Sequence, residues 1–167
     1  AEEEALARTH QFPTHGLDLS LERTRALIAI DIDHAPTPGR DPKQARATAN
    51  REGLNQAARL IGLRRWGGLV IVDLIGDGRD AAAQSEAVRA AFGHEAQAVF
   101  GPVSRFGLLE LSLPWRQTPL EDVLLDADGR PSLQTRALSL VRRLRRHLLS
   151  DSCLLYTSPS PRDGLLS

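Results

Sequence analysis

The sequence predicts an α/β fold in which helices pack on a mixed β-sheet. Apolar runs of strand length alternate with helical segments in the order β, β, α, β, α, β, β. The length of 167 residues suits a single hydrophobic core. The composition, 41% hydrophobic and 25% charged, is that of an ordinary globular protein and excludes disordered, collagen-like and membrane classes.

The first two strands are predicted to form a hairpin. Residues 17–23, LDLSLER, alternate between apolar and polar side chains, as a half-buried strand does. Residues 26–33, ALIAIDID, form an almost continuous apolar run that ends in acidic residues. We therefore expect this second strand to enter the core.

A helix is predicted to follow the loop at residues 34–42. Asp41 and Pro42 are typical of an N-cap followed by proline in the first turn. The helix should run to about Leu63 and end before Gly67 and Gly68. Its buried stripe should contain Leu54, Ala57, Ala58 and Ile61.

The rest of the predicted fold alternates again between strands and helices. Residues 69–75, LVIVDLI, have the pattern of a strand buried on both faces. The next expected element is a helix at 79–93 with Val88, Ala91 and Phe92 facing inward. A short strand at 98–100 and a strand whose leucines 109, 111 and 113 alternate with polar residues should follow. A last helix is expected at 134–149 and contains four arginines between positions 142 and 146. These arginines indicate either a solvated helix face or an RNA-facing stripe.

Composition also bears on the organisation of the chain. Lys+Arg and Asp+Glu are both 21, so nucleic-acid binding would need a local basic patch. There is no methionine, which suggests a fragment, and the single cysteine excludes a disulfide framework. We expect a poorly ordered lead-in at 1–13, one domain at 14–116, and a linker with a C-terminal helix at 117–152. Residues 153–167, CLLYTSPSPRDGLLS, resemble a translated transposon-type sequencing adapter and are left out of the fold prediction.

Two aspartates at predicted strand ends form the candidate site. Asp31 and Asp73 each close an apolar run, where an unpaired carboxylate is costly to bury. Brought together at the carboxyl edge of a sheet, they would repel each other unless a cation lay between them, and oxygen ligands suit Mg²⁺ or Mn²⁺. Asp33 should lie on the same strand face as Asp31. The alternative is that these aspartates only cap loops or helices. A haloacid-dehalogenase site is not indicated, because His34 follows where that motif has glycine and threonine.

Three segments together resemble the catalytic region of the bacterial ribonuclease E/G family. They are TRALIAIDIDHA at 24–35, GLRRWGGLVIVDLI at 62–75 and VSRFGLLELS at 103–112. The resemblance implies a DNase I-like catalytic subdomain at 14–116. It also implies an endoribonuclease that acts on single-stranded RNA in the bacterial cytoplasm, in RNA processing and decay. By the same resemblance, Asp31 and Asp73 would bind Mg²⁺ or Mn²⁺, which activates water, and Asp33 would be a catalytic neighbour.

Several positions depart from the family pattern. Asp33 replaces asparagine, Gly76 replaces a second acid, and LPW at 113–115 replaces RQR. The cysteines of the family's zinc link are absent, so we expect a short paralogue without zinc, and a homo-oligomer would have to form without it. The alternative is a degenerate homologue that binds RNA or a protein partner without cleavage. The fragment alone is expected to be inactive or nearly so.

The SRFG segment supplies two further candidates. Arg105 could contact an RNA phosphate or form a structural ion pair, and the residues do not decide between these roles. Phe106 is expected to pack in the core, with stacking on a base as the alternative.

Overall fold

The computed structural model describes residues 6–14, 16–35, 41–76 and 78–150. The chain divides into two compact units after Glu121. The adapter-like residues 153–167 lie outside the described residues, so that expectation stays a prediction. No helix among the described residues is long and apolar enough to cross a membrane.

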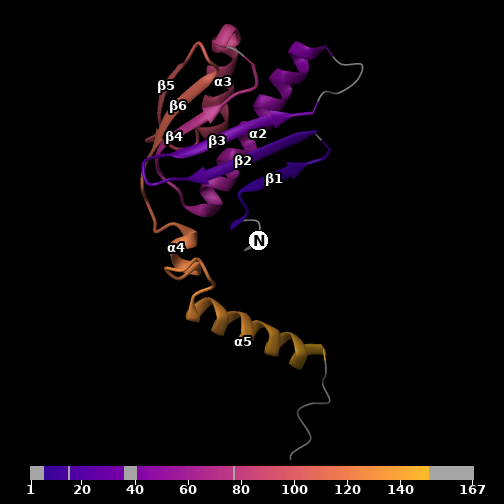
Figure 1. Ribbon diagram of the computed structural model, residues 1–167, viewed down its shortest axis with the longest axis vertical. Helices are drawn as coiled ribbons and strands as arrows, with labels where there is room; N and C mark the ends of the chain where they lie inside the picture. Colours follow the sequence, from indigo (N-terminus) through magenta and orange to yellow (C-terminus); the bar gives the residue numbers. More distant parts are fainter. Residues whose placement is uncertain (1–5, 15, 36–40, 77, 151–167) are drawn as a thin grey trace, which may run out of the picture. The chain divides into compact units, whose positions relative to one another are not determined.

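The first unit contains a six-stranded mixed sheet (Figure 1). Its strand order is β1-β2-β3-β4-β6-β5, and β3 and β4 are its parallel neighbours, whereas the other pairs are antiparallel. The strands are β1 (Thr9–Phe12), β2 (Leu17–Arg23), β3 (Ile28–His34), β4 (Gly68–Asp73), β5 (Val99–Val103) and β6 (Leu108–Leu113).

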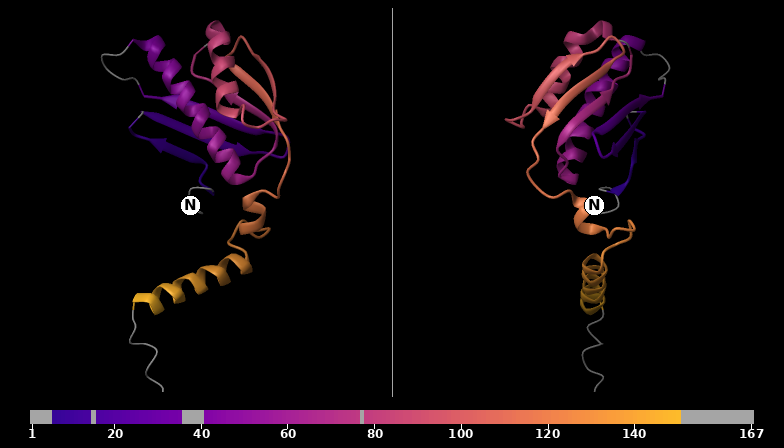
Figure 2. Two further views of the ribbon diagram at one scale, coloured as in Figure 1. Left: turned by 180° about the vertical axis from the view of Figure 1, so that it is seen from behind. Right: turned by 60° about the vertical axis from the view of Figure 1, so that its left-hand side comes forward.

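Two helices cover one face of this sheet (Figure 2). They are α2 (Pro42–Arg64), which connects β3 to β4, and α3 (Ala81–Phe92), which follows a 3₁₀ turn, η1 (Gly78–Asp80). As predicted, α2 begins with Asp41 as N-cap, whose carboxylate accepts a hydrogen bond from the Gln44 amide at 3.1 Å. The short helix α4 (Leu120–Leu124) and the helix α5 (Leu133–Ser150) complete the described chain.

The core lies between the sheet and these two helices, and its periodicity matches the prediction. Alternate residues of β2, β3 and β6 face the helices, and the predicted stripes of α2 and α3 face the sheet. The members confirmed from the sequence are Leu54, Ala57, Ala58, Ile61, Val88, Ala91, Phe92, Leu109, Leu111 and Leu113.

The lead-in expected to be poorly ordered contains a strand, so that expectation is wrong for residues 9–12. β1 pairs with β2 along its length, and the Leu21 amide donates to the Arg8 carbonyl at 2.8 Å. Arg64, buried at the end of α2, donates to the Ala7 carbonyl and lies 2.9 Å from the His10 ring. These contacts hold a segment whose own polar sequence gave little sign of a strand.

The expectation that β4 is buried on both faces is also wrong. Val70 and Val72 are fully buried against the helices, but Leu69 is 43% exposed and Asp73 is exposed. The physical reason is that α2 and α3 cover the same face, so no described element of this unit covers the other. We call this uncovered side the open face of the sheet.

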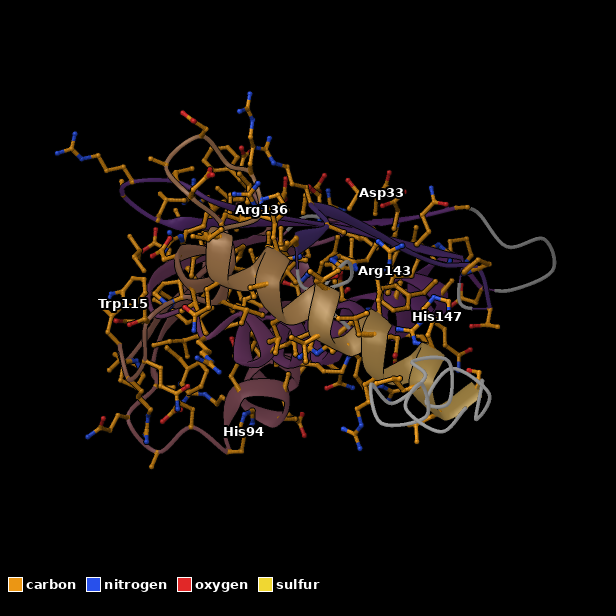
Figure 3. All side chains as sticks on the ribbon, turned by 90° about the horizontal axis from the view of Figure 1, so that it is seen from below. Asp33, His94, Trp115, Arg136, Arg143 and His147 are labelled. Carbon is orange, nitrogen blue, oxygen red and sulfur yellow. The ribbon has the colours of Figure 1, made fainter. Side chains whose placement is uncertain are left out.

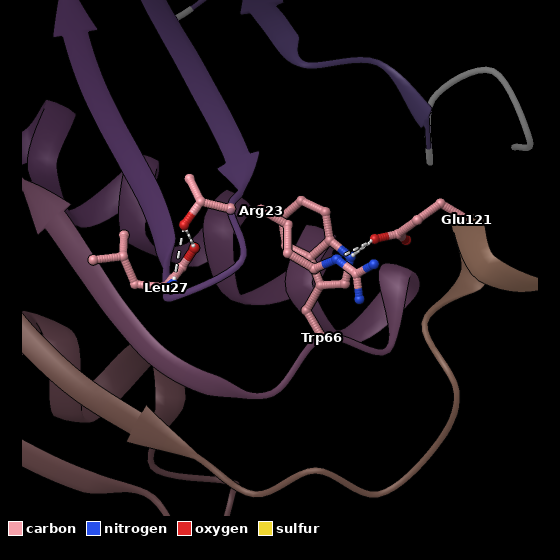
Figure 4. Close-up of polar contacts among 5 residues, drawn as sticks. Arg23, Leu27, Trp66 and Glu121 are labelled. Carbon is pink, nitrogen blue, oxygen red and sulfur yellow. Dashed lines mark hydrogen bonds and ion pairs between the residues drawn. The ribbon is translucent and has the colours of Figure 1, made fainter. Parts of the chain in front are cut away.

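A half-buried polar cluster links Glu121, the last residue of the first unit, to the sheet (Figure 4). Glu121 accepts a hydrogen bond from the Trp66 indole at 2.7 Å and forms an ion pair with Arg23 at 2.8 Å. Thr24, next to Arg23, orders the β2–β3 turn because its hydroxyl donates to the Leu27 carbonyl at 2.8 Å. Hydrogen bonds to an ionised group such as the Glu121 carboxylate are stronger than those between neutral groups.

Candidate active site

Asp31 and Asp73 are direct neighbours on the open face. They are paired residues of the parallel strands β3 and β4, and their chain neighbours Ile30, Ile32 and Val72 are buried on the helix side. Strands in a sheet lie about 4.8 Å apart, so the two carboxylates project side by side from adjacent strands. The structure therefore brings together the two aspartates that the sequence singled out.

The position of Asp31 differs from the prediction. Asp73 is the last residue of β4, but Asp31 lies in the interior of β3, which continues to His34. The strand extends because β2 pairs with it as far as Leu17 and His34. The aspartate pair thus lies on the sheet surface near the carboxyl end of β4, and not beyond the strand ends.

The surroundings of Asp31 disfavour its charge. Partial desolvation is the largest cause that raises the pKa of this carboxyl above its usual 3.8, and the negative charges of Asp73, Asp33 and Asp18 raise it further. Asp18 and Asp33 are paired residues of β2 and β3 on the same open face. The acidic side chains are thus concentrated around Asp31.

Asp33 lies two residues beyond Asp31 on the same face, as predicted, and points away from the helix layer (Figure 3). One of its carboxylate oxygens accepts a hydrogen bond from the His34 amide at 2.7 Å. Its other oxygen is available to a ligand or to water. In the described part of the chain, no group of three or more His, Cys, Asp and Glu side chains is close enough to form a metal site. Asp31 and Asp73 are therefore the two described carboxylates that could contact a cation at this place.

The SRFG turn between β5 and β6 lies beside this pair. Leu108, the first residue of β6, is paired with Asp73, and Ser104 closes the turn by accepting from the Phe106 and Leu108 amides. Gly107 is buried with a positive φ of 82°, and a Cβ there would lie 2.4 Å from the Gly76 carbonyl oxygen. Glycine is required at this close approach of two backbone segments.

Two side chains of this turn reach solvent. Arg105 is exposed, which agrees with a role in ligand contact or in an exposed ion pair. Phe106 is 82% exposed, so the expectation that it packs in the core is wrong. The turn is tight and its backbone is packed against residues 74–76, which leaves the aromatic ring no route to the interior. An exposed aromatic ring next to an acidic pair can stack on a nucleobase.

Asn50 is a site-supporting residue whose role sequence reasoning missed. This buried side chain of α2 donates to the Ile75 carbonyl at 3.0 Å and accepts from the Ile75 amide at 2.9 Å. The two bonds hold the chain where it leaves β4, two residues after Asp73. The available signal was an amide inside an otherwise apolar helix stripe, which needs buried partners.

Fold and site together define a class: an α/β domain that carries an aspartate pair on an uncovered sheet face beside an arginine and phenylalanine turn. Residues 2–115 match the sequence profile of the Ribonuclease E/G family. The chain belongs to this family. The six-stranded sheet with its packed helices agrees with an α/β domain of this kind.

Similar proteins named ribonuclease E support the same family. Ribonuclease E of Escherichia coli (strain K12) is 35% identical over 114 residues, which are 66% of this chain and 11% of that protein. Ribonuclease E of Haemophilus influenzae is 36% identical over 115 residues, 66% of this chain and 12% of the relative. For ribonuclease E of Buchnera aphidicola subsp. Acyrthosiphon pisum, the values are 32% over 112 residues, 65% and 12%. The chain thus spans about a tenth of these relatives, and the family supports a ribonuclease-type function.

Proposed function

We propose that this chain is the metal-binding part of an endoribonuclease that cleaves single-stranded RNA. The observation that carries the proposal is the direct pairing of Asp31 with Asp73 on the open face. Family membership supports RNA as the substrate, and we place the activity in RNA processing and decay in the cytoplasm. The family match does not extend past residue 115, so the whole enzyme's activity is part of the proposal.

The donor set fits a Mg²⁺ ion, with Mn²⁺ as the alternative. Mg²⁺ keeps several waters and is bound by one or two carboxylates together with substrate phosphate, and Asp31 and Asp73 supply that number. When bound, the cation polarises a phosphoryl oxygen and lowers the pKa of its water. A cation would also relieve the repulsion that raises the pKa of Asp31.

The chain's other residues have roles that follow from their positions. Asp33 would orient a water or a ligand through its second oxygen, since the first is held by the His34 amide. Arg105 would hold an RNA phosphate, and Phe106 would stack on a base next to the scissile bond. Asn50 would keep the segment after Asp73 in place through its two hydrogen bonds to Ile75.

Two observations favour the second candidate, a homologue that binds RNA or a protein partner without cleavage. LPW at 113–115 stands where the family has RQR, and Arg116 is the basic residue next to it. Arg116 forms an ion pair with Glu95. It is therefore occupied by a structural contact instead of a phosphate. The described residues also offer two metal-ligating carboxylates without a third.

Metal-dependent stabilisation tests the cation site without relying on activity. Mg²⁺ at about ten times its dissociation constant should raise the free energy of unfolding by about 1.4 kcal/mol, a few degrees in Tm. Asp31→Asn and Asp73→Asn should each abolish this increase. Glu110→Gln is the matched control, because Glu110 is an exposed acid on the open face outside the pair, and it should keep the increase. An equal response in all four proteins would refute the site.

Cleavage of a single-stranded RNA oligonucleotide separates the two candidates. The proposed ribonuclease requires Mg²⁺-dependent cleavage by the complete protein that is lost in Asp31→Asn and Asp73→Asn. RNA binding with normal Mg²⁺ stabilisation but without cleavage by that protein would favour the non-catalytic homologue.

A further inference from the structure

A second candidate site lies on the helix side of the sheet. A cavity of about 720 Å³ lies between the first turns of α2 and α3, where the chain leaves β4. Ile75 and Gly76 form part of its wall. Small-molecule sites in proteins measure about 300–1,000 Å³, so this cavity has room for a nucleotide-sized ligand.

The walls of the cavity are basic. Among the described lining residues, Lys43 and Arg46 of α2 and Arg79 of η1 are basic and Asp80 alone is acidic; Asp80 pairs with Lys43 at 2.9 Å. In the part of the chain that the structure describes, Arg46 forms no ion pair or hydrogen bond. The cavity therefore has an excess of positive charge that suits an anion.

The amino end of α3 opens on the same cavity. Asp80 is its N-cap residue but makes no capping hydrogen bond through its side chain, so no such bond satisfies the amides of the first turn. Unsatisfied first-turn amides and the helix dipole together attract phosphate groups. The lining residue Ala83 belongs to this first turn.

The buried side-chain amide of Gln84 is a second observation, independent of charge, that points to a ligand in this cavity. Gln84 lines the cavity and is 7% exposed, yet its Oε1 has no hydrogen-bond partner among the described residues. A buried acceptor without a partner destabilises the protein, and a ligand donor that reaches this amide would supply the missing hydrogen bond. A ribose hydroxyl suits either orientation of the amide because it both donates and accepts.

We propose that this cavity binds one nucleotide of a single-stranded RNA, with its phosphate at Arg46 and the amino end of α3 and a ribose hydroxyl at Gln84. Ile75 follows Asp73 by two residues, so the cavity is close to the aspartate pair along the chain, although it lies on the helix side of the sheet and the pair lies on the open face. The assignment to an RNA strand rests on the proposed function. The binding of phosphate and ribose rests on the cavity alone.

Calorimetric titration of the full chain with uridine 5′-monophosphate, without Mg²⁺, tests the binding. Arg46→Ala should weaken the nucleotide about tenfold, the usual scale of one charge-assisted contact. Arg51→Ala is the matched control, because Arg51 is an exposed arginine of α2 that does not line the cavity, and it should leave the affinity unchanged. Equal effects of the two variants, or no binding by the unmodified chain, would overturn the proposal.

Inorganic phosphate and a change at Gln84 test the second contact. Gln84→Leu removes the amide while it keeps the buried volume similar, so it should weaken uridine 5′-monophosphate and leave inorganic phosphate unaffected. Chemical shifts of the Ala83 amide report on phosphate at the helix end in every variant. Equal loss of both ligands in Gln84→Leu would overturn the ribose contact.

Competition distinguishes an RNA strand from a free nucleotide. A single-stranded RNA oligonucleotide should displace uridine 5′-monophosphate, and Asp31→Asn should not alter this. A nucleotide that binds but is not displaced would overturn the assignment to a strand. These titrations omit Mg²⁺, so they are independent of the metal-stabilisation test. Nucleotide binding without Mg²⁺ stabilisation would refute the metal site and keep the cavity, and the reverse result would refute the cavity alone.

Discussion

Asp31 is the residue at which the surroundings most oppose the charge that the proposed chemistry needs. Desolvation and three neighbouring carboxylates raise its pKa, and no described basic side chain is among the causes of its shift. A carboxylate that only served the fold would be expected to have a cationic neighbour or hydrogen-bond donors. The unfavourable surroundings of the Asp31 carboxylate are expected if it binds a cation, because the cation would supply the missing positive charge.

This cost predicts a pH-dependent gain in stability for Asp31→Asn. Because the pKa in the folded state is raised above 3.8, protonated Asp31 favours folding below that value, and this contribution is lost as the pH rises through the folded-state pKa. Asparagine does not titrate. The variant should therefore be more stable than the unmodified chain at pH 7, by less than about 1 kcal/mol for this exposed group, and the gain should vanish near pH 3.

Urea unfolding without Mg²⁺ across this pH range measures the difference. Glu110→Gln, on the same face, controls for a general loss of negative charge. A loss of stability in Asp31→Asn at pH 7 would mean that the carboxylate makes favourable contacts with the protein, against the cation-ligand interpretation.

At the scale of elements, the segment 74–76 connects the sheet face to the helix layer. Asn50 holds it from α2, and Gly107 of the SRFG turn lies against it from the other side, where the Leu74 amide donates to the Gly107 carbonyl at 3.3 Å. The proposed metal site, the Arg105 turn and the basic cavity therefore share one short stretch of backbone. Its placement depends on packing between elements that are distant in the sequence.

We predict that Asn50→Ala destabilises the domain by about 2–3 kcal/mol. It removes the Asn50 partner of the partly buried amide and carbonyl of Ile75, and an unsatisfied group of this kind costs about 1–3 kcal/mol when it is shielded from water. Thermal or urea unfolding measures the change, and Asn50→Asp, which keeps the acceptor for the Ile75 amide, should recover part of it. A change within about 0.5 kcal/mol, as for an ordinary surface substitution, would contradict the structural role.

At the scale of the whole molecule, the sequence predicted what local burial controls and missed what depends on distant partners. Periodicity indicated α2 and its stripe at Leu54 and Ile61, because helix burial repeats along the chain. It could not show that β1 joins the sheet or that the outer face of β4 is open, since both depend on where other elements pack. The sequence predicted that Asp31 and Asp73 lie close together, as their pairing shows. It did not predict that Phe106 is exposed.

The salt dependence of RNA binding tests how the charge of the whole chain is used. Net charge is +0, so binding should depend on a few local cations, here Lys43, Arg46 and Arg105. Each neutralised phosphate of a single strand contributes about −0.7 to the slope of log K against log salt, which predicts a slope of about −2. Fluorescence anisotropy of a labelled single-stranded RNA between about 50 and 200 mM salt measures it.

Variants assign this slope to its residues. Arg105→Ala should make the slope shallower by about 0.7, and Arg51→Ala should leave it unchanged. The helix α5 carries five further arginines at positions 136, 142, 143, 145 and 146. If these five arginines were the RNA contact, the slope would be about −3.5 and insensitive to Arg105→Ala, and the binding surface would have to be reassigned from the sheet domain to α5.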